Sequence, residues 1–301
     1  MVINFVVNPI AINGGWSPWD RRIGGSEECV KEWSWRLAKK KHKVSVYHNG
    51  QHGEYRYVGY FDHAEYLNRP SGVTVNINFP DLPVQEPTLY WSSLDTQGGR
   101  DLSAFKIICG ISEYQLKHCG LPTRSILLPP GYDNSQILPD RKLPRTVLYA
   151  SSPDRGLSTL LKVWPEVIRS TLNAQLLLTY GAKANLPNVI PLGEVDDDEM
   201  NDIYRTTDIW CHPANGGELY CVTGIKAQAS GCVPVVFPTM ALAETVRHGV
   251  FTTEDKLAED LIRVINDEEL KSSIRAELAG EHYPTWDETV VQLENMLKSM
   301  L

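Results

Sequence analysis

The feature that most constrains this chain is a repeated alternation of strand-like and helix-like segments. Residues 2–7 form a continuous apolar run that is typical of a buried strand, a helix is predicted from Ser26 to about residue 41, and a second strand at 43–48. The same alternation restarts at residue 146 and runs to residue 237. Strands that alternate with helices form parallel sheets with helices on both faces. We therefore predict two doubly wound α/β domains.

The remaining elements follow from the same patterns. Further strands are predicted at 55–61, 73–79, 88–93, 105–110, 125–131, 146–151, 174–181, 208–213 and 233–237. Further helices are predicted at 112–119, 157–170, 196–207, after Glu218, and at 258–267, 268–279 and 286–301. Ser26 and Ser112 are the expected N-caps of the first two helices, and Pro165 is expected to interrupt or restart the helix that contains it.

A polar, proline-containing stretch at 134–145 reads as the connection between the two domains. We place the first domain at 1–140 and the second at 141–285, with the last helix, 286–301, crossing back onto the first. Ligands of such sheets bind outside the carboxyl ends of the strands. Two domains that face each other would therefore enclose a ligand-binding cleft.

Composition narrows the class of protein. A net charge of −8 gives no general attraction to nucleic acid or to an anionic membrane. The six cysteines form no CxxC pair and have no metal-ligand spacing, so buried free thiols in a reducing cytosol are expected. The first residues lack the charged start of a signal peptide, and no apolar run reaches the roughly 18–20 residues of a membrane span. A cytoplasmic location is the expectation.

The stretch from residue 216 to 236 carries the most specific polar pattern. Glu218 and Lys226 are eight residues apart, just over two helical turns, and would share one face if the segment were helical. Gly216 and Gly217 before them allow close backbone approach. The pattern predicts a polar ligand site at a helix N-terminus, followed by a buried parallel strand.

Short motifs occur in a fixed order along nearly the whole chain. They are GGSE at 24–27, ISE at 111–113, PPGYD at 129–133, RG at 155–156, LGEV at 192–195, Glu218 with GCVPV at 231–235, Glu244 before RHG at 247–249, and Trp286. In this order the chain resembles the GT-B glycosyltransferases of the large retaining family 4, the glycosyl transferases group 1, which includes sucrose synthases, phosphatidylinositol mannosyltransferases and lipopolysaccharide glucosyltransferases.

The resemblance implies a retaining hexosyltransferase that moves a sugar from a nucleotide-diphosphate donor to an acceptor hydroxyl, without a metal ion or a cofactor. Gly25, Arg155 and Glu218 are the implied catalytic residues. Helix amides at Gly25 and the Arg155 guanidinium would stabilise the diphosphate, and the Glu218 carboxylate would stabilise positive character at the anomeric carbon. The leaving phosphate would help to deprotonate the acceptor.

The implied donor-binding set is larger. It comprises Gly24, Gly25, Arg155, Glu194, Gly217, Glu218, Leu219, Tyr220, Cys221 and Lys226. Backbone amides of 219–222 are expected to meet the diphosphate, while Tyr220 either covers the sugar or belongs to the core.

The chain departs from the family pattern at two donor positions. Lys226 occupies the place of a second glutamate that normally accepts hydrogen bonds from ribose hydroxyls, which a lysine cannot do. Four readings of Lys226 stay open: it contacts a phosphate, the nucleotide binds in a different pose, Glu194 or Glu244 takes the ribose instead, or activity is lost. Ser151 and Ser152 replace an upstream cation, whose role would pass to Arg21, Arg22 or Lys226.

The first domain is expected to hold the acceptor. Its assigned acceptor-side residues are Trp16, Trp91, Ser93 and Asp95; the last two stand where many family members have a histidine near the sugar. The implied acceptors are a glycan, a lipid-linked glycan, a protein or modified DNA. The basic, Trp-bearing segment 31–43 is read mainly as a solvated helix end, with peripheral contact to the inner membrane face or to nucleic acid as the alternative.

Three readings of function stay open at this stage. The first is the transferase, the second a nucleotide-sugar-binding protein that has lost turnover through Lys226, and the third a phosphorylase or epimerase on the same fold. The acidic run at 196–198 is read as the start of a helix, where carboxylates complement the dipole, and no metal site is predicted there.

Overall fold

A computed structural model of the protein describes residues 1–9, 16–20, 23–84, 86–135 and 141–301. The contacts within it divide the chain into two units. Unit 1 comprises Met1–Gly131 and Pro284–Leu301, and unit 2 comprises Tyr132–Tyr283. The division falls nine residues before the first predicted boundary and two residues before the second, so PPGYD at 129–133 spans the passage from one unit to the other.

The sheet of unit 1 has eight strands in the order β3-β4-β2-β1-β5-β6-β7-β8, and all its pairs are parallel except β3 with β4. The strands are β1 Val2–Val7, β2 Lys43–His48, β3 Gly53–Tyr55, β4 Val58–Asp62, β5 Val73–Ile77, β6 Thr88–Trp91, β7 Ile107–Gly110 and β8 Ile126–Leu127. The central strands are almost fully buried, as expected for a parallel sheet.

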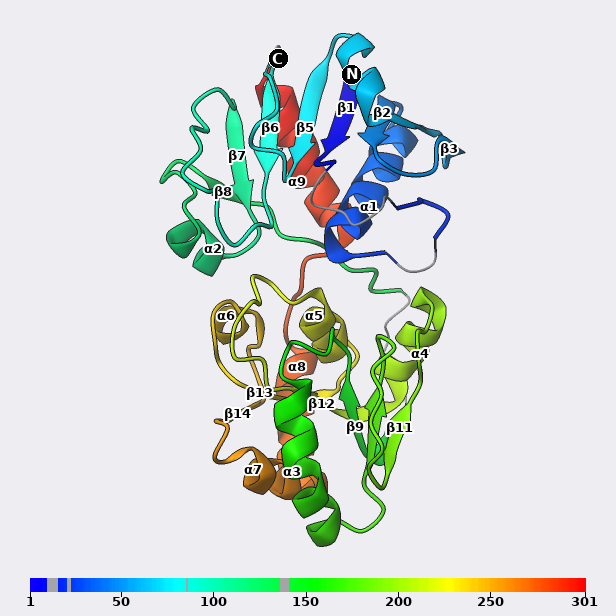
Figure 1. Ribbon diagram of the computed structural model, residues 1–301, viewed down its shortest axis with the longest axis vertical. Coiled ribbons are helices and arrows are strands. Elements are labelled where there is room, and N and C mark those ends of the chain that lie inside the picture. Colours follow the sequence, from blue (N-terminus) through cyan, green and yellow to red (C-terminus); the bar gives the residue numbers. More distant parts are fainter. Residues whose placement is uncertain (10–15, 21–22, 85, 136–140) are drawn as a thin grey trace. The chain divides into compact units, whose positions relative to one another are not determined.

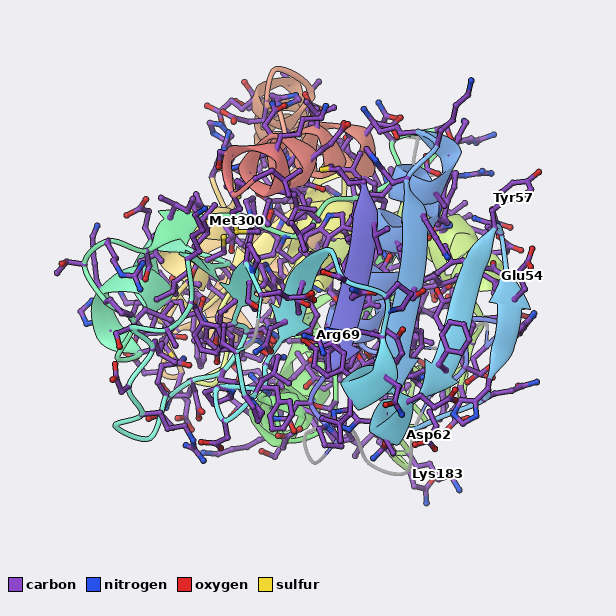
Figure 2. All side chains as sticks on the ribbon, turned by 90° about the horizontal axis from the view of Figure 1, so that it is seen from above. Glu54, Tyr57, Asp62, Arg69, Lys183 and Met300 are labelled. Carbon is purple, nitrogen blue, oxygen red and sulfur yellow. The ribbon has the colours of Figure 1, made fainter. Side chains whose placement is uncertain are left out.

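The predicted single strand at 55–61 is wrong. The chain reverses at Arg56 and Tyr57, whose φ angles are 48° and 69°, so β3 and β4 form an antiparallel hairpin. Two consecutive positive φ values are the geometry of a tight hairpin turn, which usually carries Asn-Gly. Figure 2 shows Tyr57 and Glu54 at the outer edge of this sheet, and Tyr57 is 81% exposed.

Helix α1, Gly25–Lys39, packs against α9, Trp286–Ser299, in unit 1 (Figure 1). The Trp33 indole donates to the Thr289 hydroxyl at 2.9 Å and meets the Trp91 ring edge-on at 5.3 Å. The unit also contains the 3₁₀ helix η1, His63–Asn68, and α2, Glu113–His118. Ser112 caps α2, as predicted, because its side chain accepts from the Gln115 amide.

The N-cap predicted for α1 is wrong. The helix begins after Gly24, which has no side chain to cap it, and the Ser26 hydroxyl instead lies 3.0 Å from the hydroxyl of Ser93. The first amides of α1 are therefore left without a capping side chain from Gly24.

Unit 2 is built around a six-stranded, wholly parallel sheet in the order β11-β10-β9-β12-β13-β14. Its strands are β9 Leu143–Tyr149, β10 Gln175–Leu178, β11 Val189–Pro191, β12 Thr207–His212, β13 Val233–Val236 and β14 Val250–Phe251. Its helices are α3 Leu157–Ser170, α4 Asp197–Thr206, α5 Val222–Ala229, α6 Leu242–Thr245, α7 Leu257–Asn266 and α8 Glu268–Ala279.

Two apolar clusters cover the two faces of this sheet. Leu160 and Trp164 of α3 pack with Leu261 of α7 on one face, and Tyr204 of α4 packs with Ala227 of α5 on the other. Helix α3 runs through Pro165 without a break, in contrast to the predicted interruption. Asp196 caps α4 with a capping box, so the acidic run at 196–198 begins a helix, as predicted.

The strand order of unit 2 reverses between β9 and β12. From β9 the chain builds outward through β10 to β11, then returns to pair β12 with the other side of β9 and continues outward to β14. In doubly wound sheets the crevice at such a reversal, beyond the carboxyl ends of the strands, is the usual ligand site. Of the described residues, none forms a helix that is long and apolar enough to cross a membrane.

Candidate functional site

Two loops meet at the reversal point of unit 2, and a glycine makes the meeting possible. The β9–α3 turn contains Arg155, whose amide bonds the Ser152 carbonyl at 3.0 Å. Gly156 follows at φ 93°, and a Cβ there would overlap the Pro213 carbonyl oxygen in the loop after β12. A residue with a side chain would both strain the backbone and separate the loops. Gly156 therefore holds the Arg155 turn against the loop that carries Glu218.

The Glu218 carboxylate lies between two nitrogen donors. Its Oε1 atom is 3.0 Å from Nε2 of His212 and 3.6 Å from NH1 of Arg155. The Glu218 side chain is 13% exposed and that of Arg155 is 31% exposed. Gly217, at φ 78°, lies against the guanidinium, because a Cβ there would overlap it. The sequence-predicted Arg155, Gly217 and Glu218 thus come together.

His212 was not among the sequence-predicted site residues. It is the last residue of β12, is fully buried, and stacks on Trp210 with ring centroids 5.2 Å apart. Because a carboxylate only accepts hydrogen bonds, the Nε2 atom that faces Glu218 must carry the hydrogen. The other ring nitrogen, Nδ1, is buried without a hydrogen-bond partner in the described part of the chain. The one signal in the sequence is its place near the end of the predicted strand at 208–213.

Glu218 and Lys226 do not share a helix face, in contrast to the prediction from their spacing. Helix α5 begins only at Val222, after Cys221 at φ 66°, so Glu218 lies in the preceding loop. The loop is fixed from the other side by the Ala241 amide, which donates to the Glu218 carbonyl at 3.2 Å. Lys226 lies in α5 and is half-buried.

Cys221 adds a third ligand type to the site. His212, Glu218 and Cys221 each offer an atom within 4.8 Å of the others, a spacing that could hold a metal ion. Burial, followed by the nearby Glu218 charge, raises the pKa of the Cys221 thiol well above its usual range, which opposes the thiolate that a metal requires. The Arg155 guanidinium on the same carboxylate also opposes a dication. The donor set is better suited to hydrogen bonding than to metal binding.

The other predicted donor residues of unit 2 differ in exposure. Leu219 and Tyr220 are each 8% exposed, so mainly their backbone is available to a ligand. Glu194 is exposed and lies beside Gly181, past the carboxyl end of β10. The predicted partner cations Arg21 and Arg22 lie outside the described residues.

In unit 1 the start of α1 lies beside the ends of β5 and β6. Gly24 and Gly25 are exposed there. Asn78 bridges the strand ends: its amide nitrogen donates to the Ser93 hydroxyl at 2.9 Å, and its amide oxygen accepts from the Ser93 amide at 2.7 Å. The Glu27 carboxylate folds back against Gly24, and burial raises the pKa of Glu27. The exposed helix start thus has a carboxyl group beside it.

The acceptor-side residues occupy different environments. Trp91 is 1% exposed and donates to the Leu128 carbonyl at 2.9 Å, so its ring belongs to the core, and its assignment to a ligand surface is corrected. Ser93 is half-buried and Asp95 is exposed. Trp16 lines a pocket in this unit.

The basic segment at 31–43 is largely paired within its own unit. Arg36 bonds Asp287 at 2.9 Å, and Lys40 bonds Glu294 at 2.8 Å, both acids being on α9. The Trp35 ring has the Arg36 guanidinium 4.4 Å from its centroid. Two cations of this segment are therefore paired with acids of α9, and the alternative reading had assigned them to a membrane or nucleic acid.

Comparison with known proteins places these features in a class. The family model of glycosyl transferases group 1 matches residues 144–267, which include both Arg155 and Glu218. Phosphatidyl-myo-inositol mannosyltransferase from Mycobacterium tuberculosis is 27% identical over 117 residues, 35% of this chain and 31% of that protein. The enzyme of the same name from Mycolicibacterium smegmatis is 25% identical over 170 residues, 50% of this chain and 44% of that protein. The aligned part thus spans less than half the length of these relatives.

Solved structures extend the likeness to the whole chain. Sucrose-phosphate synthase from Thermosynechococcus elongatus superimposes with a TM-score of 0.76 at 13% identity, covering 100% of this chain and 99% of that one. HepE from Anabaena, in complex with UDP and glucose, gives 0.70 at 11% identity, covering 99% and 100%. The protein therefore has the GT-B fold of glycosyltransferases.

The family-model match narrows the assignment within the GT-B fold, because it covers most of unit 2. Residues 144–267 match the glycosyl transferases group 1 family, and the curated relatives that the chain resembles are mannosyltransferases. The resemblance seen in the ordered motifs is confirmed. That the two units face each other across a cleft stays a prediction.

Proposed function

We propose that the protein transfers a hexose from a nucleoside-diphosphate sugar to an acceptor hydroxyl with retention of anomeric configuration. The observation that carries the proposal is the pairing of Arg155 with Glu218 at the reversal point of the unit 2 sheet, 3.6 Å apart. A cation and a carboxylate side by side match the two charges that form when a glycosyl–phosphate bond breaks. The names of the relatives, among them mannosyltransferases and a protein bound to UDP and glucose, support a nucleotide-sugar donor.

The two side chains take opposite parts in this proposal. The Arg155 guanidinium binds diphosphate oxygens, for which its planar fork is suited, and in doing so exchanges part of its contact with Glu218. The Glu218 carboxylate then faces the sugar, where it stabilises positive character at the anomeric carbon. His212 keeps the carboxylate in place throughout, because its ring is locked by burial and stacking.

The acceptor and the leaving diphosphate exchange places on one face of the sugar. The acceptor oxygen attacks the anomeric carbon on the face that the diphosphate leaves, and the acceptor proton passes to the departing phosphate oxygen. The amides of Leu219, Tyr220 and the α5 start, together with those of Gly24 and Gly25, donate to the diphosphate. We propose that this charge stabilisation needs no metal ion, so nucleotide release should persist in excess EDTA.

Nucleoside-diphosphate release from a panel of UDP-, GDP- and ADP-hexoses tests the proposal. Wild-type protein should release nucleotide slowly from one donor without acceptor, and Arg155→Gln and Glu218→Gln should each lower that rate at least a hundredfold while the protein stays folded. Arg169→Gln and Glu254→Gln, exposed residues of the same unit, are the matched controls. Wild-type rates in either site variant would refute the assigned roles, and phosphate-dependent cleavage of a glycan would favour a phosphorylase.

A second function is favoured by one residue. Lys226 stands where the family pattern has a glutamate, so the chain could bind a nucleotide sugar without turning it over. Donor binding measured by calorimetry, with no nucleotide release from any donor of the panel, would select this reading. The acceptor classes named above, a glycan, lipid-linked glycan, protein or modified DNA, remain part of the proposal. So does a cytoplasmic location, with peripheral contact to the inner membrane face as its variant.

A further inference from the structure

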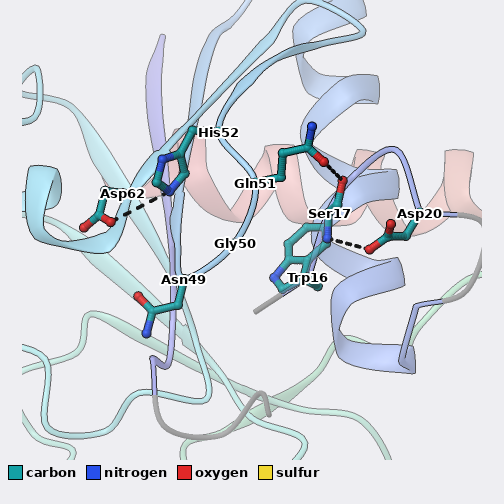
Figure 3. Close-up of a pocket in the computed structure, with 8 residues that line it drawn as sticks. All are labelled: Trp16, Ser17, Asp20, Asn49, Gly50, Gln51, His52 and Asp62. Atoms are coloured by element: carbon teal, nitrogen blue, oxygen red, sulfur yellow. Dashed lines mark hydrogen bonds and ion pairs between the residues drawn. The ribbon is translucent and has the colours of Figure 1, made fainter. Parts of the chain in front are cut away.

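Unit 1 contains a pocket of about 580 Å³, and of its described lining residues only Trp16 has been assigned a role above. It is lined by Trp16, Ser17, Asp20, Asn49, Gly50, Gln51, His52 and Asp62 (Figure 3). Residues 49–52 directly follow β2, and Asp62 ends β4, so the pocket lies past the carboxyl ends of two parallel strands, where sheets of this kind bind ligands. Its volume falls within the roughly 300–1,000 Å³ of small-molecule sites.

The polar side chains of the pocket are held in place by one atom each. The Asn49 amide nitrogen donates to the Pro9 carbonyl at 3.1 Å, which leaves its amide oxygen as an acceptor. The Ser17 hydroxyl donates to the Gln51 amide oxygen at 3.0 Å, which leaves the Gln51 nitrogen as a donor. The Ser17 amide donates to one oxygen of Asp20 at 2.9 Å. Anchored side chains of this kind lose little entropy when a ligand binds.

The opposite wall repeats the arrangement. One oxygen of Asp62 accepts from the Ala64 amide at 2.8 Å, and the other lies 3.8 Å from Nε2 of His52 (Figure 3). Between the walls the chain passes close to Trp16, since a Cβ on Gly50 would overlap the Trp16 carbonyl oxygen. The Trp16 indole is 6% exposed, and its N–H has no acceptor among the described residues.

An exposed aromatic side chain stands beside the pocket. Trp19, whose amide donates to the Ser17 hydroxyl at 3.2 Å, is 40% exposed. Its ring meets the Tyr55 ring edge-on with centroids 5.9 Å apart, which limits its movement. A fixed indole face next to alternating donors and acceptors suits the apolar face and hydroxyl edge of a pyranose.

We propose that this pocket binds an uncharged sugar ring of the acceptor. Of the described residues that line it, two are carboxylates and none is lysine or arginine, so a phosphate group would be repelled. That the bound ring belongs to the acceptor rests on the proposed function. That the pocket binds a sugar ring rests on the pocket itself. The glycan class of acceptor is thereby favoured over an acceptor whose recognised part is a phosphate.

Saturation-transfer NMR on the full chain tests the ligand class. The probes are the methyl α-pyranosides of glucose, mannose and galactose, then glucosamine, then glucose 6-phosphate. At least one methyl pyranoside should give a saturable signal, and glucose 6-phosphate should bind at least tenfold more weakly. Stronger binding of glucose 6-phosphate, tenfold stronger binding of glucosamine, or no signal from any methyl pyranoside would overturn the proposal.

Variants test the place of binding. Asn49→Ala and Gln51→Ala should each weaken the methyl pyranoside signal at least fivefold, whereas Asn68→Ala, an exposed amide at the end of η1, should not. Unchanged binding in both pocket variants would overturn the assignment of the site. Nucleotide release without acceptor should be the same in Asn49→Ala as in wild type. If wild type releases no nucleotide but binds the pyranoside in this pocket, the proposed function fails and the sugar site stands.

Discussion

The Nε2 atom of His212 lies 3.0 Å from Oε1 of Glu218, and the imidazole that makes this contact has no exposed surface. A buried ring that can donate only through this nitrogen fixes the direction of the carboxylate. The contact places His212 among the positioning residues of the site, since it acts through Glu218 and not on the donor itself.

His212→Ala should therefore lower the rate of nucleotide release and leave donor affinity almost unchanged. Loss of a hydrogen bond to a charged group costs about 1.5–3 kcal/mol, or roughly ten- to a hundredfold in rate. His212→Gln keeps a donor near the position of Nε2 and should recover at least part of the loss. Steady-state kcat and KM for the donor separate the two effects. Equal loss in the Gln and Ala variants, with an intact fold by circular dichroism, would contradict a positioning role.

Gly217→Ala should displace the Arg155 guanidinium without unfolding unit 2. A Cβ at Gly217 overlaps the end of a flexible side chain, which can move away, so the expected result is a rise in donor KM of about tenfold. Gly99→Ala is the matched control, because its φ of 70° imposes the same backbone strain in open space. Donor KM is the measurement, and a normal KM in Gly217→Ala would show that the guanidinium position is unimportant.

Gly156→Ala should act on stability instead. Here the overlap is with the backbone carbonyl of Pro213, which cannot move without shifting the loop, and φ is 93°. Together they should cost about 1–3 kcal/mol in the free energy of unfolding of unit 2. Gly280→Ala, at φ −86° and with its nearest atom at 3.4 Å, should be close to neutral. Urea unfolding compares the two, and a neutral Gly156→Ala would mean that the two loops are not tightly packed.

These contacts show which parts of the site the sequence could predict. Arg155, Gly217 and Glu218 follow from motif spacing, and the structure brings them together. Spacing alone could not show whether Glu218 and Lys226 share a helix face. The start of α5 depends on a positive φ at Cys221, a residue with no turn preference. His212 looked like one more strand residue, since a single histidine in an apolar run gives no sign of its partner.

For the fold, too, local patterns could be predicted from the sequence and contacts between distant residues could not. The alternation of strands and helices gave the parallel sheets and their order along the chain, because burial on both faces leaves a continuous apolar run. The hairpin at Arg56 and Tyr57 was missed because neither residue favours a positive φ. The N-cap of α1 was misplaced because the Ser26 hydroxyl bonds Ser93, a contact between residues that are far apart in the sequence.

Acid should destabilise unit 1 through Glu294. The nearby Lys298 ammonium, followed by that of Lys40, lowers the pKa of this carboxyl from 4.5 to about 2. The stabilisation is therefore complete above pH 4.5 and is lost as the pH falls towards 2. Glu294→Gln should lower the free energy of unfolding by about 2 kcal/mol at pH 7 and should narrow its difference from wild type at pH 3. Urea titrations at both pH values measure this, with Glu54→Gln as the exposed control in unit 1; a pH-independent difference would contradict the ion pair.

The dependence of stability on pH has the opposite sign at Glu27, at the start of α1. Burial raises its carboxyl pKa, so the folded state favours the protonated form, and stability is gained as the pH falls through the raised pKa. Glu27→Gln should therefore stabilise unit 1 at pH 7 and less so at pH 5. Because the carboxyl lies against Gly24, where the diphosphate is proposed to bind, the same variant should lower donor KM at pH 7 severalfold by removing a like charge. Thermal melts and donor KM at pH 5 and 7 test both effects. A raised KM would instead show that the Glu27 carboxylate assists the donor, and a lower melting temperature would show that its charge supports the helix.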